Sequence, residues 1–189
     1  MKFSKALLRS RALLERKKKH SKVKKFNFNL LFSLIKRNFS NRKISIAGYY
    51  PSNYEVDVIK FIKEAVNKNF KVSLPVIGPS NSMCFRSWSF QEPLYLNKFG
   101  IPEPKDSNKE IIPDLIIVPL VAFDKHLNRI GYGKGYYDRS LNKINKTKKK
   151  TIFLGVAYSF QKCNIIPTNK YDFKLDYILT EQGIIGWNY

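Results

Sequence analysis

An apolar segment that leads into a glycine-rich turn constrains this chain more than any other part of its sequence. Residues 115–118 read Leu-Ile-Ile-Val, a short and partly β-branched run that is typical of a strand covered on both faces. A polar turn follows, and residues 131–135 then read Gly-Tyr-Gly-Lys-Gly. We therefore expect a buried strand whose carboxyl end opens onto a ligand site built by a glycine loop.

The glycine loop has the composition of an anion site. Its three glycines allow positive φ angles, so that consecutive N–H groups can point at one anion. Lys134 would add a positive charge, and a helix expected over residues 136–144 would direct its N-terminus at the same anion. Asp138 would lie in the first turn of that helix, where its carboxylate suits a magnesium ion carried by phosphates. The pattern predicts a phosphate site.

Spacing excludes two common phosphate-binding motifs. A Walker A loop requires Ser or Thr directly after its lysine, and Gly135 stands there. A dinucleotide fingerprint reads G-x-G-x-x-G directly after a strand, whereas this loop reads G-x-G-x-G after a longer connection. On these residues alone, a glycine-rich turn without a ligand remains an alternative.

The segment around the loop carries a family resemblance. Residues 123–139, FDKHLNRIGYGKGYYDR, with Pro119 upstream, resemble the signature of the 5-formyltetrahydrofolate cyclo-ligase family, whose members are also called 5,10-methenyltetrahydrofolate synthetases. Further segments agree in the same order along the chain: KALLR at 5–9, YPSNYE at 50–55, FGIPEP at 99–104 and DFKLD at 172–176. Together they cover essentially the whole sequence.

The resemblance implies an ATP- and magnesium-dependent ligase that converts 5-formyltetrahydrofolate to 5,10-methenyltetrahydrofolate and releases ADP and phosphate. In such enzymes the formyl oxygen attacks the γ-phosphate, N10 closes on the activated formyl carbon, and phosphate leaves. No nucleophilic side chain is required, so the protein contributes positioning and charge neutralisation. By the resemblance, Lys134, Arg9 and Tyr136 are the catalytic residues.

The resemblance also implies which positions bind each ligand. The positions that match nucleotide-binding residues are Lys5, Ala6, Leu7, Leu8, Arg9, Arg129, Ile130, Gly131, Tyr132, Gly133, Lys134, Gly135, Tyr136 and Tyr137. The positions that match substrate-binding residues are Arg9, Tyr50, Glu55, Tyr132, Lys134 and Tyr136. The positions that match magnesium ligands are Asp138 and Asp172. Asn169 and Tyr171 depart locally from the acidic residue and the histidine that the family pattern has there.

Two of these assignments have simpler alternatives. Glu55 would complement the helix dipole if it stood in the first turn of the following helix. By the resemblance it instead contacts folate, and a carboxylate suits the paired N–H donors on the amino-pyrimidine edge of a pterin. Lys5 and Arg9 are four residues apart and share a helix face, where they would repel each other unless they faced an anion such as a nucleotide.

The net charge of +21 is concentrated near the start of the sequence, because residues 1–43 hold fifteen Lys or Arg and one acid, Glu15. Three interpretations compete: nucleic-acid binding, a transit peptide, and a helix of the fold whose basic face meets a small polyanion. An apolar stripe favours the third and predicts no specific nucleic-acid partner. The expected stripe consists of Phe3, Leu7, Ser10 and Leu14, with Lys5, Arg9 and Arg16 opposite it. One further hypothesis is that this basic region raises affinity for polyglutamylated folates.

Length and cysteine content bound the remaining expectations. The 189 residues suit one domain over 1–189, with a basic helix over residues 1–20 as part of it. Cys84 and Cys163 are too few for a disulfide framework, so we expect reduced thiols and a cytoplasmic protein. The longest apolar stretch, 111–123, is too short and too interrupted to span a bilayer, and no membrane partner is expected. We expect a monomer or weak dimer.

Strands and helices alternate along the chain. Strands are expected at residues 44–50, 71–75, 84–90, 115–121, 152–158 and 177–180, and helices near 1–20, 23–39, 58–66 and 136–144. This alternation predicts an α/β protein, a three-layer α/β/α arrangement with a mostly parallel or mixed, Rossmann-like central sheet. The resemblance implies the NagB/RpiA/CoA-transferase-like fold.

Two rival functions remain open at this point. A related ATP-dependent enzyme that acts on another formylated or folate-like substrate would use the same loop. A catalytically inactive RNA- or polyanion-binding protein would keep the fold without the chemistry. Glu55, Lys134, Asp138 and Asp172 are all present in the sequence, and that counts against the second rival.

Overall fold

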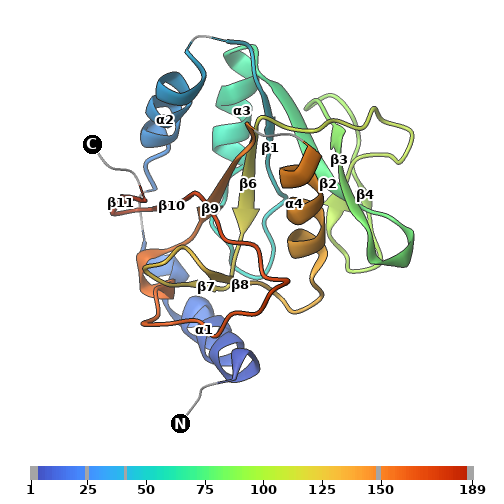
Figure 1. Cartoon of the computed structure of the whole chain (residues 1–189). Helices are drawn as coiled ribbons and strands as arrows, with labels where there is room; N and C mark the ends of the chain where they lie inside the picture. The colour runs from blue at the N-terminus through green and yellow to red at the C-terminus, as the bar shows by residue number, and fades with distance from the viewer. Residues whose placement is uncertain (1–3, 24–25, 41, 148–149, 187–189) are drawn as a thin grey trace.

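A seven-stranded sheet lies at the centre of the computed structural model, which describes residues 4–23, 26–40, 42–147 and 150–186 (Figure 1). The strand order is β11-β10-β9-β6-β1-β2-β3. The strands are β1 (Ser45–Ala47), β2 (Lys71–Ile77), β3 (Met83–Ser87), β6 (Leu115–Pro119), β9 (Ile152–Val156), β10 (Tyr177–Thr180) and β11 (Gly183–Ile185). The inner strands are parallel, whereas β3 and β11 pair antiparallel at the two edges. The predicted α/β class with a mixed central sheet is confirmed.

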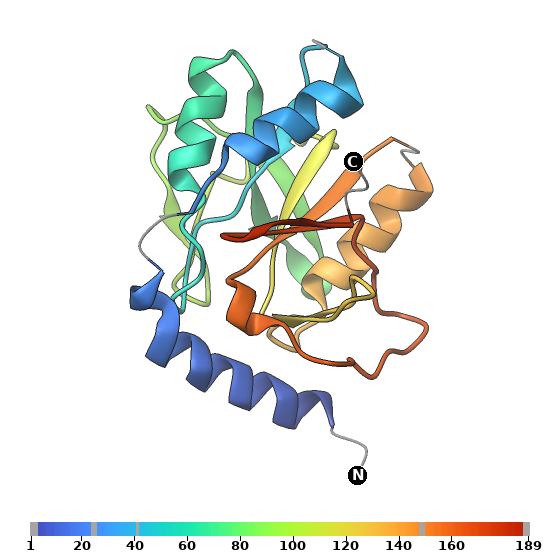
Figure 2. The same ribbon diagram turned by 90° about the vertical axis from the view of Figure 1, so that its left-hand side faces the viewer.

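Helices cover both faces of this sheet. The helices α2 (Asn29–Phe39) and α3 (Ile59–Asn67) lie on one face, and α4 (Tyr136–Thr147) lies on the other (Figures 1 and 2). Alternation along β6 accounts for the two cores, because successive side chains of a strand point to opposite faces. Leu115 and Ile117 pack with the α2 and α3 cluster, whereas Ile116 and Val118 pack with the α4 cluster.

Short elements complete the chain and were not predicted. They are the antiparallel pairs β4 (Tyr95–Leu96) with β5 (Pro102–Glu103) and β7 (Ala122–Phe123) with β8 (Arg129–Ile130), and the 3-10 helices η1 (His20–Lys22), η2 (Pro79–Asn81) and η3 (Ser159–Gln161). Two-residue strands leave no periodicity to read in a sequence. The β7–β8 hairpin matters for the site because it carries the chain from the end of β6 into the glycine loop.

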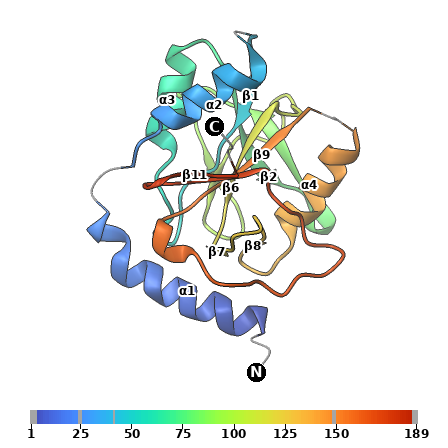
Figure 3. The same ribbon diagram turned by 60° about the vertical axis from the view of Figure 1, so that its left-hand side comes forward.

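Helix α1 (Lys5–Lys19) runs across the carboxyl end of the sheet, next to the β7–β8 hairpin (Figure 3). Its predicted apolar stripe is wrong: Leu7 and Leu14 are 41% and 60% exposed, and Phe3 lies outside the described residues. The residues of α1 that face the protein interior are Lys5, Leu8, Arg9, Ala12, Leu13 and Arg16.

The physical reason for this difference is that the inward face of α1 mixes two kinds of side chain. Leu8, Ala12 and Leu13 pack against a small core around the β7–β8 hairpin. Arg9 and Arg16 lie on the same face and donate hydrogen bonds to backbone carbonyls at the end of the sheet. A prediction from apolar spacing alone therefore assigned the solvent-facing side of α1 to the core.

Several predicted boundaries were also wrong. The second helix begins at Asn29, and Val23 is extended, so the apolar spacing before Asn29 does not continue a helix. The first strand holds only Ser45–Ala47 of the expected 44–50, and β3 ends at Ser87. Within the part of the chain that the structure describes, no helix is long and apolar enough to cross a bilayer.

Candidate active site

A cleft of about 1450 Å³ opens at the carboxyl ends of β1 and β6. The strand order reverses between these two neighbours, because the chain passes from β1 outward to β3 and then resumes on the other side at β6. Open α/β sheets bind ligands at such a reversal. Tyr49 and Tyr50 after β1 and Pro119 at the end of β6 line the cleft. The volume exceeds the roughly 300–1,000 Å³ typical of a site for one small ligand, so two ligands can fit.

The glycine loop forms one wall of the cleft. Gly133 and Gly135 have φ angles of +94° and +69°, in the left-handed region that glycine adopts without steric cost. Arg9 packs on the loop, since its Nε donates to the Gly131 carbonyl at 2.7 Å and a Cβ on Gly133 would lie 3.2 Å from its Cζ. Helix α4 begins directly after the loop, so its N-terminus borders the cleft. This geometry suits an anion.

A second arginine, Arg139, fixes the loop from the α4 side. Its Nη2 donates to the Lys134 carbonyl at 3.0 Å and to the Asn81 carbonyl at 2.9 Å, and its guanidinium lies 5.5 Å from the centre of the Tyr136 ring. The Tyr136 hydroxyl donates to Asn81 Oδ1 at 3.0 Å. The turn between β2 and β3 is thereby bonded to the glycine loop. Sequence reasoning missed Asn81, and it gave no role to Arg139 although the family signature ends there.

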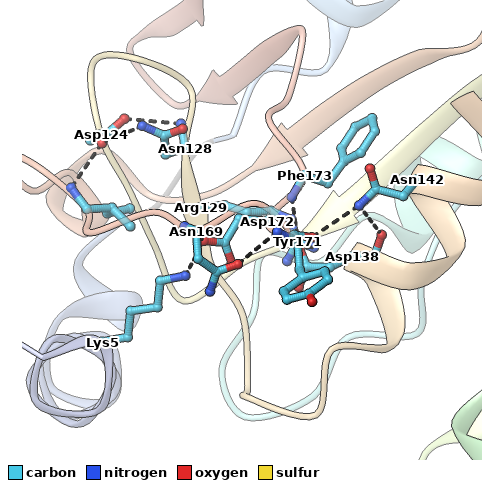
Figure 4. A network of polar contacts seen from close by, with 11 residues as sticks. Lys5, Asp124, Asn128, Arg129, Asp138, Asn142, Asn169, Tyr171, Asp172 and Phe173 are labelled. Atoms are coloured by element: carbon cyan, nitrogen blue, oxygen red, sulfur yellow. Dashed lines mark hydrogen bonds and ion pairs between the residues drawn. The ribbon is translucent and has the colours of Figure 1, made fainter.

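The two aspartates assigned to magnesium each pair with a cation. Asp138 Oδ1 accepts hydrogen bonds from Arg129 Nη2 at 2.7 Å and from the Phe173 N–H at 3.2 Å. Asp172 forms an ion pair with Lys5, as Figure 4 shows. Burial lowers the pKa of the Arg129 guanidinium, and the nearby Asp138 and Asp172 act in the opposite direction. Both carboxylates therefore lie close to the same buried arginine.

The residues that depart from the family pattern shape the turn that carries Asp172. The Asn169 N–H donates to Asp172 Oδ2 at 2.6 Å, and the Tyr171 N–H donates to Asn169 Oδ1 at 2.8 Å (Figure 4). Asn142 on α4 donates to the Tyr171 carbonyl at 3.1 Å. The Asn169 side chain thus braces the turn itself, whereas the bond to α4 uses the backbone carbonyl of Tyr171, whose ring is exposed.

The donor set fits a magnesium ion held mainly by phosphates and water. Among the described residues, no group of three or more His, Cys, Asp or Glu side chains forms a metal cage. Magnesium in phosphoryl-transfer sites commonly takes only one or two carboxylates from the protein. Asp138 and Asp172 match that demand.

Glu55 lies in the loop after β1 and lines the cleft. Its Oε1 accepts the Tyr132 hydroxyl at 2.8 Å, and its Oε2 accepts the Ser52 N–H at 2.8 Å. Burial raises the pKa of Glu55, while the hydrogen bond from Ser52 lowers it. The following helix begins only at Ile59, so the interpretation of Glu55 as a first-turn acid is wrong.

The cleft brings together most, but not all, of the positions assigned from sequence. The residues that line it from those sets are Lys5, Arg9, Tyr50, Glu55, Arg129, Ile130, Gly131, Tyr132, Gly133, Lys134, Gly135, Tyr136, Tyr137, Asp138 and Asp172. Ala6, Leu7 and Leu8 do not line it: Leu8 packs on the β7–β8 core, and Leu7 is exposed.

Four cations on the cleft wall were not predicted: Arg139, Lys143, Lys146 and Lys170. The first three recur on α4 at intervals of four and three residues, which places them on one helix face. That spacing was a usable signal. The cleft wall therefore carries more positive than negative charge.

Comparisons with known proteins agree on one family. The profile of the 5-formyltetrahydrofolate cyclo-ligase family matches residues 1–181. The chain is 36% identical over 141 residues to a 5-formyltetrahydrofolate cyclo-ligase of Haemophilus influenzae, covering 71% of this chain and 74% of that protein. It is 30% identical over 149 residues to the cyclo-ligase of Escherichia coli K12, covering 76% and 81%.

Solved structures agree as well. A 5,10-methenyltetrahydrofolate synthetase of Aquifex aeolicus superposes with a TM-score of 0.73 at 30% identity, covering 95% of this chain and 91% of that one. A 5,10-methenyltetrahydrofolate synthetase of Mycoplasma pneumoniae superposes with a TM-score of 0.68 at 24% identity, covering 94% and 98%, which supports the fold.

Proposed function

This chain belongs to the 5-formyltetrahydrofolate cyclo-ligase family, and we propose that its cleft binds ATP and 5-formyltetrahydrofolate side by side. The protein is a ligase that forms 5,10-methenyltetrahydrofolate, as its relatives are named. One contact carries the proposed arrangement: the Tyr132 hydroxyl of the glycine loop donates to Glu55 Oε1 at 2.8 Å. The glycine loop, which suits phosphates, thus contacts Glu55, which suits a pterin.

The folate side is built around Glu55. A carboxylate offers two acceptors to the paired N–H groups of the pterin's amino-pyrimidine edge. Tyr50, in the same loop as Glu55, also lines the cleft and is 37% exposed, so its ring is open to a ligand. Tyr136 and Phe99 also line the cleft, with 6.0 Å between their ring centres, and we propose that these rings bound the space for the formylated part of the substrate.

The nucleotide side is built around the glycine loop. Its N–H groups, the N-terminus of α4 and Lys134 hold the phosphates, and Lys5 and Arg9 reach them from α1. The formyl oxygen attacks the γ-phosphorus and ADP leaves, N10 then attacks the formyl carbon, and phosphate departs with the former formyl oxygen. Lys134, Arg9 and Tyr136 align the reactants and neutralise the transferred charge.

Asp138 and Asp172 would hold a magnesium ion on the nucleotide phosphates. When bound, this ion supplies charge neutralisation at the transferred phosphoryl group. Arg129 and Lys5 form ion pairs with Asp138 and Asp172 and hold the two carboxylates at the cleft wall.

The basic rim of Arg139, Lys143, Lys146 and Lys170 suits a polyglutamylated substrate. Among the described residues of the basic N-terminal segment, only Lys5 and Arg9 line the cleft, so we assign the recognition of tail carboxylates to the rim. We also propose that residues 1–189 act as one catalytic unit in the cytoplasm, as a monomer or weak dimer without a specific nucleic-acid partner.

The direct test is to incubate the purified protein with magnesium, ATP and 5-formyltetrahydrofolate and to follow the methenyl product by its near-ultraviolet absorbance. Lys134→Ala should lower the rate about 100-fold, because it removes a charge from the transferred group. Lys17→Ala, at an exposed position of α1, should leave the rate unchanged. If the folded protein binds ATP but forms no product, another formylated substrate is indicated. If the unmutated protein does not bind ATP at all, the polyanion-binding alternative is favoured.

A further inference from the structure

Arg16 is a buried arginine that the proposed chemistry does not use. It is 1% exposed and does not line the cleft. Its Nη1 donates to the Leu120 carbonyl at 3.1 Å, and its Nη2 donates to the Tyr132 hydroxyl. Among the described residues its Nε has no hydrogen-bond partner and its charge has no direct ion pair. A buried charge of this kind is costly unless an opposite charge lies nearby.

The opposite charge lies one residue further along the same chain of contacts. A guanidinium only donates hydrogen bonds, so the Tyr132 oxygen accepts from Arg16 and its single proton is available for Glu55. That proton is donated to Glu55 Oε1 at 2.8 Å. The second carboxylate oxygen is held by the Ser52 N–H at 2.8 Å. The orientation of the carboxylate is thereby set from α1, through the glycine loop.

We propose that Arg16 is a positioning residue for folate recognition: acting through the Tyr132 hydroxyl, it holds Glu55 charged and oriented for the N–H donors of the pterin ring. The inference rests on the proposed folate role of Glu55. It predicts that Arg16 sets the affinity for the folate and leaves the affinity for ATP unchanged.

The electrostatics of the surrounding groups agree with this geometry. Burial raises the pKa of Glu55, and Arg16 is the cation that lowers it. The other titratable groups facing Glu55 are the hydroxyls of Tyr49, Tyr132 and Tyr137, whose pKa values burial also raises, so they are neutral. Among the described groups, Arg16 is the cation that offsets the burial of this carboxylate.

A double-mutant cycle on the full chain tests the proposal. Arg16→Met and Tyr132→Phe should each weaken 5-formyltetrahydrofolate binding about tenfold in isothermal titration, as expected for loss of a charge-assisted hydrogen bond. The double variant should bind little worse than either single one, because both changes break one chain of contacts. ATP affinity should stay unchanged in Arg16→Met, since Arg16 does not line the cleft. Lys17→Met, the same change at an exposed position of α1, should affect neither ligand.

The pH profile separates positioning from packing. In Arg16→Met the pH at which folate affinity falls should move upward, and Arg16→Lys should restore it in part because the charge remains.

Equal losses of ATP and folate affinity, or additive losses in the double variant, would overturn the proposal. If Arg16→Met does not fold, Arg16→Gln takes its place in the cycle, since it removes the charge but keeps a polar side chain. Glu55→Gln serves as reference: unchanged folate binding there would refute the role of Glu55 itself, independently of Arg16.

Discussion

Lys5 and Asp172 form an ion pair between α1 and the turn that precedes β10, although they are 167 residues apart in the sequence. Their side chains are 25% and 23% exposed, so the pair stands at the edge of the cleft and not in the core. Asp172 also accepts the Asn169 N–H at 2.6 Å. The pair joins the helix that carries Arg9 to the turn that carries a proposed magnesium ligand.

Asp172→Asn should abolish most of the gain in ATP affinity that magnesium provides. The substitution keeps the size of the side chain but removes a charge that a hard cation requires. The measurement is titration of ATP with and without magnesium, where the ratio of affinities should fall about tenfold. Asp106→Asn is the matched control, because that side chain is 80% exposed and lies away from the cleft. An unchanged ratio in Asp172→Asn would remove Asp172 from the proposed ligand set.

Gly133→Ala should impair nucleotide binding beyond its effect on stability. Its φ of +94° is unfavourable for alanine, and the new Cβ would press on Arg9 at 3.2 Å from Cζ. Gly183→Ala is the control, because φ is +137° there and no atom lies within 4 Å. Both variants should lose about 1–3 kcal/mol in denaturant unfolding, whereas only Gly133→Ala should lose ATP affinity. Similar ATP affinities in the two variants would contradict a specific role for the Arg9 contact.

Replacing Lys143 and Lys146 together by Gln should raise the Michaelis constant for polyglutamylated substrate about fivefold at low salt, because two charges facing the tail are lost. The constant for monoglutamate should change little. The effect should shrink as salt is added, since exposed charges are screened. Lys60→Gln with Lys63→Gln on α3 is the control, as these lysines do not line the cleft. Equal constants for both substrates at every salt concentration would refute tail recognition by the rim.

The affinity for folate should fall with decreasing pH at a higher pH than an ordinary glutamate would give. Burial raises the pKa of Glu55 above its usual value of 4.5, and the neutral acid cannot accept two N–H donors at once. The free energy of unfolding depends on pH in the opposite sense. Because the pKa of this carboxyl is raised in the folded chain, its contribution to stability grows as pH falls through that raised pKa. Titrating folate and ATP affinity from acidic to neutral pH checks this, and Glu55→Gln should flatten the folate curve.

Features that depend on local sequence patterns could be predicted, whereas features that depend on contacts between distant residues could not. The β6 strand and the glycine loop were predictable, because an apolar run and a glycine pattern are local signals. The position of Glu55 opposite Tyr132 was not, since it depends on the pairing of β1 with β6 and on the β7–β8 hairpin. The family resemblance supplied the folate role that local patterns lacked.

Arg16 illustrates the limit most clearly. An arginine in a lysine-rich helix is usually a solvated side chain. It is buried here because the Leu120 carbonyl and the Tyr132 hydroxyl, both more than 100 residues away, accept hydrogen bonds from its guanidinium. The small β11 strand was missed for a related reason: Gly183–Ile185 gains its strand geometry only by pairing with β10.

The docking of α1 on the β7–β8 hairpin and on Ile166 also has a consequence for synthesis. During synthesis, more than 140 residues are added after α1 before its last packing partner, Ile166, has been made. The guanidinium of Arg16 and the leucines beside it therefore lack their partners until at least residues 120–132 have been added. The cleft is therefore completed late, by a long-range closure of the kind that slows folding.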